Sequence, residues 1–146
     1  MEQIGPARPD ERPAIEALLT AAGLPHDDIG PHLAYFTVAR EGERVVGVIG
    51  LEVHGQDGLV RSLAVAPDRR GLGVARRLYA SSLARAQRAG ITRLYVVAPA
   101  AQGWFALLGF RTAAPESVPD AIRTTHQFQL LSDHSAVLVR SMPRSS

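Results

Sequence analysis

The stretch from Leu63 to Ala75 constrains the fold of this chain more than any other. It reads LAVAPDRRGLGVA, which is an apolar run typical of a strand, a loop with two glycines, and the start of a helix. A helix that begins directly after such a loop points several backbone N–H groups and the positive end of its dipole at one place. Glycine also lets a ligand approach the backbone closely. The segment predicts a pyrophosphate-binding site, although a plain helix start with two turning glycines would have the same sequence.

The order of strand and helix patterns along the chain predicts a mixed α/β fold. Before the loop we expect a strand at 3–8, a helix from Pro9 that ends at Gly23, a short helical turn at 24–29, and strands at 35–40, 44–54 and 59–65. After it we expect a helix at 72–90, a strand at 93–97, a helix at 99–108, a strand from Phe110 and a strand at 135–140. Because no repeat, low-complexity run or linker divides the sequence, residues 1–146 are expected to form a single domain.

Residue usage excludes several kinds of chemistry. The chain has no cysteine, so disulfides, thiolate zinc sites and a cysteine nucleophile are excluded, and a reducing, cytoplasmic location is expected. All 16 basic residues are arginine, so no lysine can form a Schiff base. The five histidines show no metal-ligand spacing, so we expect no metal. The first residues lack a signal-peptide pattern and no apolar run is long enough to span a bilayer, so no membrane contact is expected.

The basic residues are concentrated in one part of the chain. Residues 61–93 contain eight arginines and a single acidic residue, Asp68. A local excess of positive charge suits a polyanionic ligand. Nucleic acid is an alternative ligand of this kind, but no aromatic stacking platform accompanies the arginines and the rest of the chain is acidic. We therefore expect a small polyanion and no nucleic acid.

Two motifs give the chain a family resemblance. The segment Arg70-Gly71-Leu72-Gly73-Val74-Ala75 fits the pattern Arg/Gln-x-x-Gly-x-Gly/Ala, and Leu108-Gly109-Phe110 ends the following short helix. With these motifs the chain resembles, over nearly its whole length, the GCN5-related N-acetyltransferases (GNAT), which transfer acetyl from acetyl-CoA to amines. The resemblance implies a largely antiparallel sheet flanked by helices, in which the strands containing 63–65 and 95–97 splay apart around the pantetheine arm. It also implies that acetyl-CoA is held by Leu63, Ala64, Val65, Arg70, Gly71, Leu72, Gly73, Val74, Ala75 and Phe105.

A narrower resemblance concerns the acceptor. The segments at 24–28, 50–52, 59–65 and 119–128 are similar to the arsenic-resistance branch of these acetyltransferases. That branch has Cys-Pro where this chain has Ser132-Asp133, so a thiol that could meet trivalent arsenic is missing. The resemblance implies a small amine acceptor, an amino-acid-like organoarsenical or phosphinate, and relatives of this kind are commonly homodimers.

Amine acetylation requires a neutral amine, a donor to the tetrahedral oxyanion, and a proton for the leaving thiolate. The resemblance implies that a backbone N–H near Ala64 or Val65 supplies the oxyanion donor. Ser62 belongs to the stretch where family members often carry a carboxylate, so Glu52 on the neighbouring strand becomes the candidate base, acting through water. A structural ion pair with Arg61 is the alternative role for Glu52.

Phe105 stands where the family has a tyrosine that protonates the thiolate, and phenylalanine has no proton to donate. The alternative to an enzyme is therefore a non-catalytic acyl-CoA-binding sensor or subunit. An arginine near the acceptor would suit a carboxylate, phosphinate or arsenate-like group, because its planar fork matches such anions. The candidate acceptor-binding residues are Arg61, Arg123, Thr125, His126 and Gln127.

Overall fold

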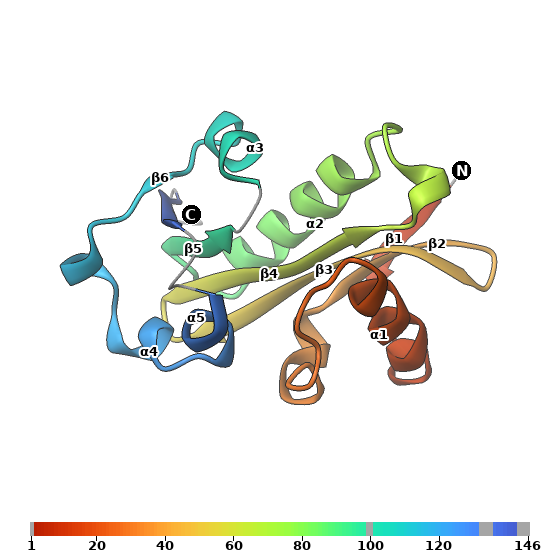
Figure 1. The fold of residues 1–146 in the computed structure, drawn as a ribbon, viewed down its shortest axis with the longest axis horizontal. Helices are drawn as coiled ribbons and strands as arrows, with labels where there is room; N and C mark the ends of the chain where they lie inside the picture. The colour runs from red at the N-terminus through yellow and green to blue at the C-terminus, as the bar shows by residue number, and fades with distance from the viewer. Residues whose placement is uncertain (1, 99–100, 132–135, 143–146) are drawn as a thin grey trace. The chain divides into compact units, whose positions relative to one another are not determined.

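The computed structural model describes residues 2–98, 101–131 and 136–142 (Figure 1). The chain divides into two compact units, the first made of Met1–Leu51 and Ser62–Arg85 and the second of Glu52–Arg61 and Ala86–Ser146. Two strands, β3 (Arg44–His54) and β4 (Asp57–Val65), and the helix α2 (Val74–Arg88) contribute residues to both units. None of the described helices is long and apolar enough to cross a membrane.

The described strands form one seven-stranded sheet in the order β1-β2-β3-β4-β5-β7-β6. The other strands are β1 (Gln3–Pro6), β2 (Thr37–Glu41), β5 (Arg93–Ala98), β6 (Arg111–Thr112) and β7 (Ala136–Ser141). β4 and β5 are parallel, whereas β1–β2, β2–β3, β5–β7 and β6–β7 are antiparallel. The helix α2 lies in the crossover connection that two parallel strands require. The expected mixed, largely antiparallel sheet with flanking helices is confirmed.

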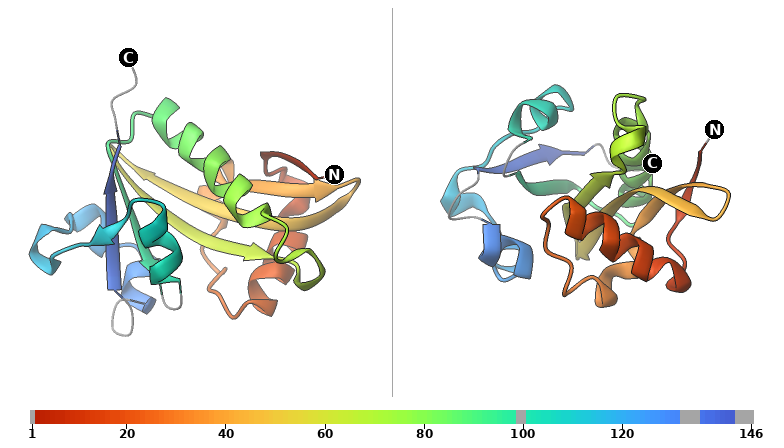
Figure 2. Two further views of the ribbon diagram at one scale, coloured as in Figure 1. Left: turned by 90° about the horizontal axis from the view of Figure 1, so that it is seen from above. Right: turned by 45° about the vertical axis from the view of Figure 1, so that its right-hand side comes forward.

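In the first unit, α1 (Arg12–Ala21) and α2 cover opposite faces of β3 (Figure 2). Ile15 and Leu19, one helical turn apart, bury one face of α1 in a core that includes Val48 of β3. Gly47, the preceding residue of β3, is on the other face, next to Val74 and Leu78 of α2. Neighbouring residues of a strand point to opposite faces, so this pair of contacts places the two helices on different sides.

Gly47 permits the close approach of α2 to the strand. A Cβ atom at this position would lie 2.9 Å from Cδ1 of Leu78 and 3.1 Å from Cγ1 of Val74. Because Val74 is the first residue of α2, the missing side chain sets the distance of the helix start from β3. The glycine is therefore a packing requirement of the element that begins after the two-glycine loop.

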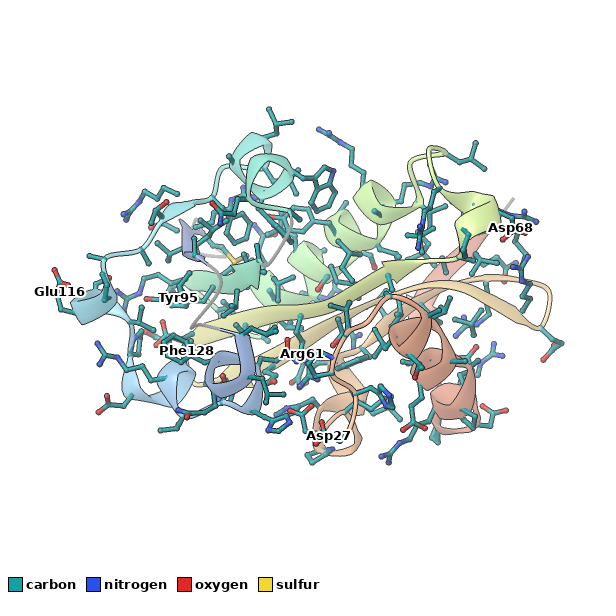
Figure 3. The ribbon with its side chains drawn as sticks, in the orientation of Figure 1. Asp27, Arg61, Asp68, Tyr95, Glu116 and Phe128 are labelled. Carbon is teal, nitrogen blue, oxygen red and sulfur yellow. The ribbon has the colours of Figure 1, made fainter. Side chains whose placement is uncertain are left out.

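The second unit has its own core around the central strand β5. Leu59 of β4, Tyr95 of β5 and Val139 of β7 are buried together with Ala113, Val118 and Ile122. Three short helices belong to this unit, α3 (Gln102–Leu107), α4 (Asp120–Arg123) and α5 (His126–Leu131). Phe128 of α5 packs against this core, and Phe128 and Tyr95 can be located in Figure 3.

The structure corrects several expected boundaries. The turn expected at 24–29 is instead the 3-10 helix η2 (Gly30–Tyr35), so the next strand begins at Thr37 rather than at residue 35. The helix expected at 72–90 begins at Val74, because Gly71 and Gly73 have left-handed backbones with φ of 79° and 81°. Residue 99, where a helix was expected to begin, and residue 135, where the last strand was expected to begin, lie outside the described residues. The remaining 3-10 helices are η1 (Pro9–Glu11), η3 (Pro67–Arg69) and η4 (Pro115–Ser117).

A buried ion pair fastens the N-terminal segment to β2. The Arg40 guanidinium donates to both carboxylate oxygens of Glu11, at 2.8 and 2.7 Å, and the two side chains are only 9% and 10% exposed. We expect Glu11→Gln to lower the free energy of unfolding by about 3 kcal/mol at pH 7, because it leaves a buried guanidinium without its charge partner. Urea unfolding curves would measure this difference.

The stability that the Glu11–Arg40 pair contributes should depend on pH. The hydrogen bonds from Arg40 hold the pKa of Glu11 below its ordinary value of 4.5. Since the folded pKa is below the unfolded one, the pair stabilises the fold above about pH 4.5, and this contribution is lost as the pH falls through the folded pKa. The difference in the free energy of unfolding between the wild type and Glu11→Gln should therefore become smaller at acidic pH. Glu43→Gln, at an exposed position in the β2–β3 turn, is the control and should change nothing measurable. An equal gap at pH 7 and pH 3 would contradict the prediction.

Candidate active site

The loop between β4 and α2 presents an exposed stretch of backbone. Arg70, Gly71, Leu72 and Gly73 are all exposed, and both glycines have the positive φ that other residues rarely adopt. The first N–H groups of α2 follow directly, and a helix leaves its first four N–H groups without intrahelical partners. With the positive end of the helix dipole, these donors make an anion-binding arrangement of the kind that the sequence predicts.

Most arginines beside this loop are already neutralised within the first unit. Arg69 donates to Glu41 at 2.6 Å and to Asp68 at 2.9 Å, and Arg44 holds Asp68 through two bonds of 2.8 and 2.9 Å. The bonds from Arg44 lower the pKa of Asp68 to about 2. Arg77 pairs with Glu2.

Two arginines of this region differ from the paired ones. Arg70 is exposed and, within the part of the chain that the structure describes, bonds only a backbone oxygen, Val65 O, at 3.2 Å. Arg76 is also exposed, and no ion pair involves it among the described residues. Arg70 and Arg76 are therefore the positive charges that this loop can offer to a ligand.

The second unit contains a buried charge cluster. Arg61 Nη1 on β4 donates to Glu52 Oε2 on β3 at 2.8 Å, and His54 Nε2 lies 2.9 Å from the other oxygen, Glu52 Oε1. The side chains of Arg61 and Glu52 are 0% and 2% exposed, and that of His54 is 25% exposed (Figure 3 labels Arg61). Glu52 is therefore not a surface carboxylate, and the ion pair with Arg61 that the sequence left open is present.

Ser62 lies within β4, directly after Arg61. It has φ of 58°, the only positive φ among the described residues other than glycine. A left-handed residue inside a strand bends the backbone locally. The parallel pairing of β4 with β5 runs from Asp57–Arg93 to Val60–Val96 and includes none of Leu63 to Val65, although β5 continues to Ala98. The pairing therefore ends before residues 63–65, as the resemblance implies, whereas Tyr95 and Val96, expected to lie in the parted stretch, are still paired with Leu59 and Val60.

Phe105 on α3 is part of an aromatic cluster. It is 4% exposed, and its ring meets Phe110 edge-on at 5.3 Å and Trp104 at 5.0 Å between ring centroids. Edge-to-face aromatic pairs at these distances stabilise a core. The position where the family has tyrosine is thus used for packing in this chain.

Two of the residues expected to contact the acceptor, Arg123 and Thr125, form hydrogen bonds with the backbone of their own segment. The Arg123 guanidinium donates to the carbonyls of Val118 at 2.9 Å and Pro115 at 2.5 Å, so it holds a backbone turn. Thr125 donates to Ile122 O at 2.7 Å and accepts the N–H of Phe128 at 3.2 Å, which makes it the N-cap of α5.

His126 and Gln127 form the first turn of α5, a helix that the sequence prediction missed together with α4. The signals that could have found them are Asp120 after Pro119, which suits a first helical turn, and Thr125 as a cap before residues 126–131. Gln127 is 5% exposed, so its side chain is buried.

The family model for the acetyltransferase (GNAT) family matches residues 5–110. The chain belongs to the GNAT family. The resemblance inferred from Arg70–Ala75 and Leu108–Phe110 is therefore confirmed at the level of the family, and both motifs lie within the matched residues. Residues 111–146 of this GNAT chain, which include Arg123 to Gln127, lie beyond the match.

The chain is also similar to known amino-acid acetyltransferases, in sequence and in structure. The chain is 28% identical over 115 residues to an amino-acid acetyltransferase of Neisseria meningitidis, covering 77% of this chain and 26% of that protein. It is 27% identical to N-acetylglutamate synthase from Neisseria gonorrhoeae complexed with coenzyme A and N-acetyl-glutamate, with a TM-score of 0.86, covering 99% of this chain and 36% of the other. The GNAT chain thus spans about a quarter to a third of the length of these relatives.

A further solved structure agrees on the fold alone. An acetyltransferase of the GNAT family from Staphylococcus aureus is 15% identical, with a TM-score of 0.78, and the match covers 98% of this chain and 100% of the other. The seven-stranded sheet is therefore the GNAT fold.

Proposed function

We propose that this chain transfers the acetyl group of acetyl-CoA to the amine of a small, amino-acid-like molecule, and that residues 1–146 act as one acetyltransferase domain. The observation that carries the proposal is the exposed loop with left-handed Gly71 and Gly73 directly before the 15-residue helix α2. Such a helix start binds pyrophosphate, and coenzyme A carries one. Family membership and the coenzyme A in the Neisseria gonorrhoeae structure support this ligand.

The residues of the first unit are assigned to the co-substrate. Leu63, Ala64 and Val65 are taken as the backbone along the pantetheine arm, and Arg70 to Ala75 as the backbone around the pyrophosphate. During transfer the amine nitrogen bonds the thioester carbonyl carbon, the C–S bond breaks, the amine loses a proton and the thiolate of coenzyme A gains one. A backbone N–H of Ala64 or Val65 is the proposed donor to the oxyanion.

The residues of the second unit are assigned to the acceptor. The names of the relatives, amino-acid acetyltransferase and N-acetylglutamate synthase, support an acceptor with an amine and a carboxylate. The finer proposal is an acceptor with a carboxylate-like oxyanion, including an organoarsenical or a phosphinate. Because both oxygens of Glu52 are engaged by Arg61 and His54, we assign Glu52 to holding Arg61 in place rather than to taking the proton directly.

Melting temperature with and without acetyl-CoA tests the co-substrate. A ligand at about 100 times its dissociation constant stabilises a fold by roughly 2.7 kcal/mol, which raises the melting temperature of a domain of this size by several degrees. We expect this shift at 1 mM acetyl-CoA and a smaller one with dephospho-acetyl-CoA. The absence of any shift would contradict the proposal, because the glycine loop would then be only a structural turn.

Release of free coenzyme A tests the transfer itself. The panel contains L-glutamate, L-methionine, an α-amino acid with a phosphinate side chain and an aromatic amino-arsenonate, together with the α-carboxamide of each amino acid. We expect amine-dependent release above the rate of hydrolysis. A thermal shift without release for any amine would instead support the non-catalytic acyl-CoA-binding alternative, which Phe105 in place of the family's tyrosine favours.

A further inference from the structure

A buried nitrogen in the second unit lacks the hydrogen bond that burial normally requires. Gln127 of α5 is 5% exposed, and its Nε2 has no hydrogen-bond partner among the described residues. Two other buried side-chain atoms of the described residues share this state, but His26 Nδ1 lies 3.7 Å from the Glu16 carboxylate and Asp57 Oδ1 lies 3.4 Å from the Arg93 guanidinium, so each has a polar group nearby. An unsatisfied buried donor is costly and uncommon, so Gln127 needs an explanation.

The polar side chains next to Gln127 in the sequence form hydrogen bonds with the backbone, whereas Gln127 Nε2 has none among the described residues. Arg123 donates to two carbonyls of the turn at 115–118, and Thr125 caps α5. Gln129, two residues further on, is exposed and donates from its Nε2 to Arg123 O at 2.8 Å. Three neighbours therefore stabilise α4 and α5 through their side chains, whereas the carboxamide nitrogen of Gln127 is buried without such a bond.

The position of α5 within its unit links this donor to the parting of the strands. Phe128, the next residue, packs against a core that contains Leu59 and Tyr95 (Figure 3). Leu59 and Tyr95 face each other in the β4–β5 register, one pair before that register ends at Val60–Val96. Gln127 thus belongs to the first turn of a helix that packs beside the last paired residues of β4 and β5.

From these observations we infer that the Gln127 carboxamide donates a hydrogen bond from Nε2 to the oxyanion of the acceptor, a carboxylate or an isosteric phosphinate or arsenonate. The inference rests on the proposed function, because that function supplies an amine with an oxyanion. A carboxamide adds no charge to the site and donates in a fixed plane, and a hydrogen bond to an ionised oxygen is about twice as strong as one to a neutral oxygen. Gln127 therefore favours acceptors with an oxyanion over the matching amides.

The test replaces Gln127 with methionine, which has a similar volume and no donor. We expect the KM for the acids of the panel to rise at least about tenfold, while kcat, the KM for acetyl-CoA and the KM for L-methionine α-carboxamide, the amide of the panel that carries no oxyanion, change less than about twofold. Gln127→Glu, which places a negative charge against the oxyanion, should raise the KM for the acids further. Comparing the carboxylate, phosphinate and arsenonate acceptors shows which oxyanion the donor serves.

Stability without any ligand provides a second readout. Removing a buried donor that has no partner costs the fold little, so the melting temperature of Gln127→Met should stay the same or rise. The matched control is Gln129→Met, which removes a bond to Arg123 O and should lower the melting temperature slightly without changing any KM.

Three outcomes would overturn the inference. A melting temperature that falls in Gln127→Met means that the carboxamide is bonded within the protein. An unchanged KM for the acids, in a wild type that acetylates them, contradicts the inference alone and leaves the proposed function standing. A wild type that binds acetyl-CoA and acetylates no amine contradicts the proposed function and this inference together.

Discussion

Replacing Gly73 with glutamate should weaken the binding of acetyl-CoA by about 100-fold or more, which corresponds to roughly 2.7 kcal/mol. Gly73 has φ of 81°, and a Cβ at this position would lie 2.9 Å from Nη1 of Arg77, so any side chain disturbs the loop. A carboxylate here would also repel the pyrophosphate of the ligand. Titration calorimetry would measure the change, and the loss should be smaller at high salt, because salt screens exposed charges.

The same substitution should leave the fold intact. A negative charge near a helix N-terminus is favourable to the helix itself. Gly90→Glu is the matched control, because Gly90 has the same left-handed backbone, with φ of 83°, and no atom within 4 Å of its Cβ position, yet it follows the other end of α2. Wild-type affinity in Gly73→Glu, or an equal loss in Gly90→Glu, would show that the loop before α2 does not bind the co-substrate.

Breaking the buried pair of Glu52 and Arg61 should have the largest effect on stability. We expect Glu52→Gln to lower the free energy of unfolding by about 3 to 5 kcal/mol, because the Arg61 side chain, 0% exposed, loses its charge partner. Chemical denaturation would measure the loss. The double variant Glu52→Gln/Arg61→Met should recover much of it, because the buried guanidinium is then removed together with the carboxylate that it faces.

An exposed ion pair in the same protein isolates the effect of burial. Arg44 and Asp68 are joined by bonds of 2.8 and 2.9 Å, but their side chains are 52% and 53% exposed. Asp68→Asn should therefore change stability very little, since exposed pairs contribute little. A loss as large as that of Glu52→Gln would contradict the assignment of the difference to burial.

The Glu52 variant also separates two roles for this residue. If Glu52 only holds Arg61, Glu52→Gln should keep most of its kcat at temperatures well below its own melting point, and the KM for the acceptor should carry the defect. If Glu52 is the base that the sequence suggested, kcat falls at every temperature and its pH profile changes. The first outcome is the one that the two engaged oxygens of Glu52 predict.

The parts of the fold that depend on local pattern could be predicted. The β-branched run at 44–54 is a strand with the same bounds in the structure, and the helix predicted at 72–90 from the apolar spacing at 75–86 contains all of α2 (Val74–Arg88). The helices α4 and α5 were missed because they have four and six residues, too short for apolar periodicity to develop. Their caps, read at Pro119 and Thr125, are weaker signals than a repeated apolar face.

The candidate site likewise has one part that could be predicted from local sequence and one part that could not. The cofactor loop could be read from sequence because its residues are contiguous, and glycine at two fixed positions has a direct backbone meaning. The acceptor residues could only be guessed as a group. Whether Arg123 meets a ligand or a carbonyl, and whether the amide of Gln127 is bonded, depends on contacts between residues that no sequence spacing specifies.

Packing at Gly47, in the core of the first unit, should affect how tightly the loop before α2 binds its ligand. The methyl group of Gly47→Ala would press on the side-chain ends of Leu78 and Val74, and if these do not turn aside, the start of α2 moves by a few tenths of an ångström. The row of amide donors at that helix start would move with it, and hydrogen bonds weaken steeply with misalignment. Under the proposed function, a buried position that never meets acetyl-CoA can thus tune its residence time, so selection on affinity can act on the packing of the strand as well as on the loop.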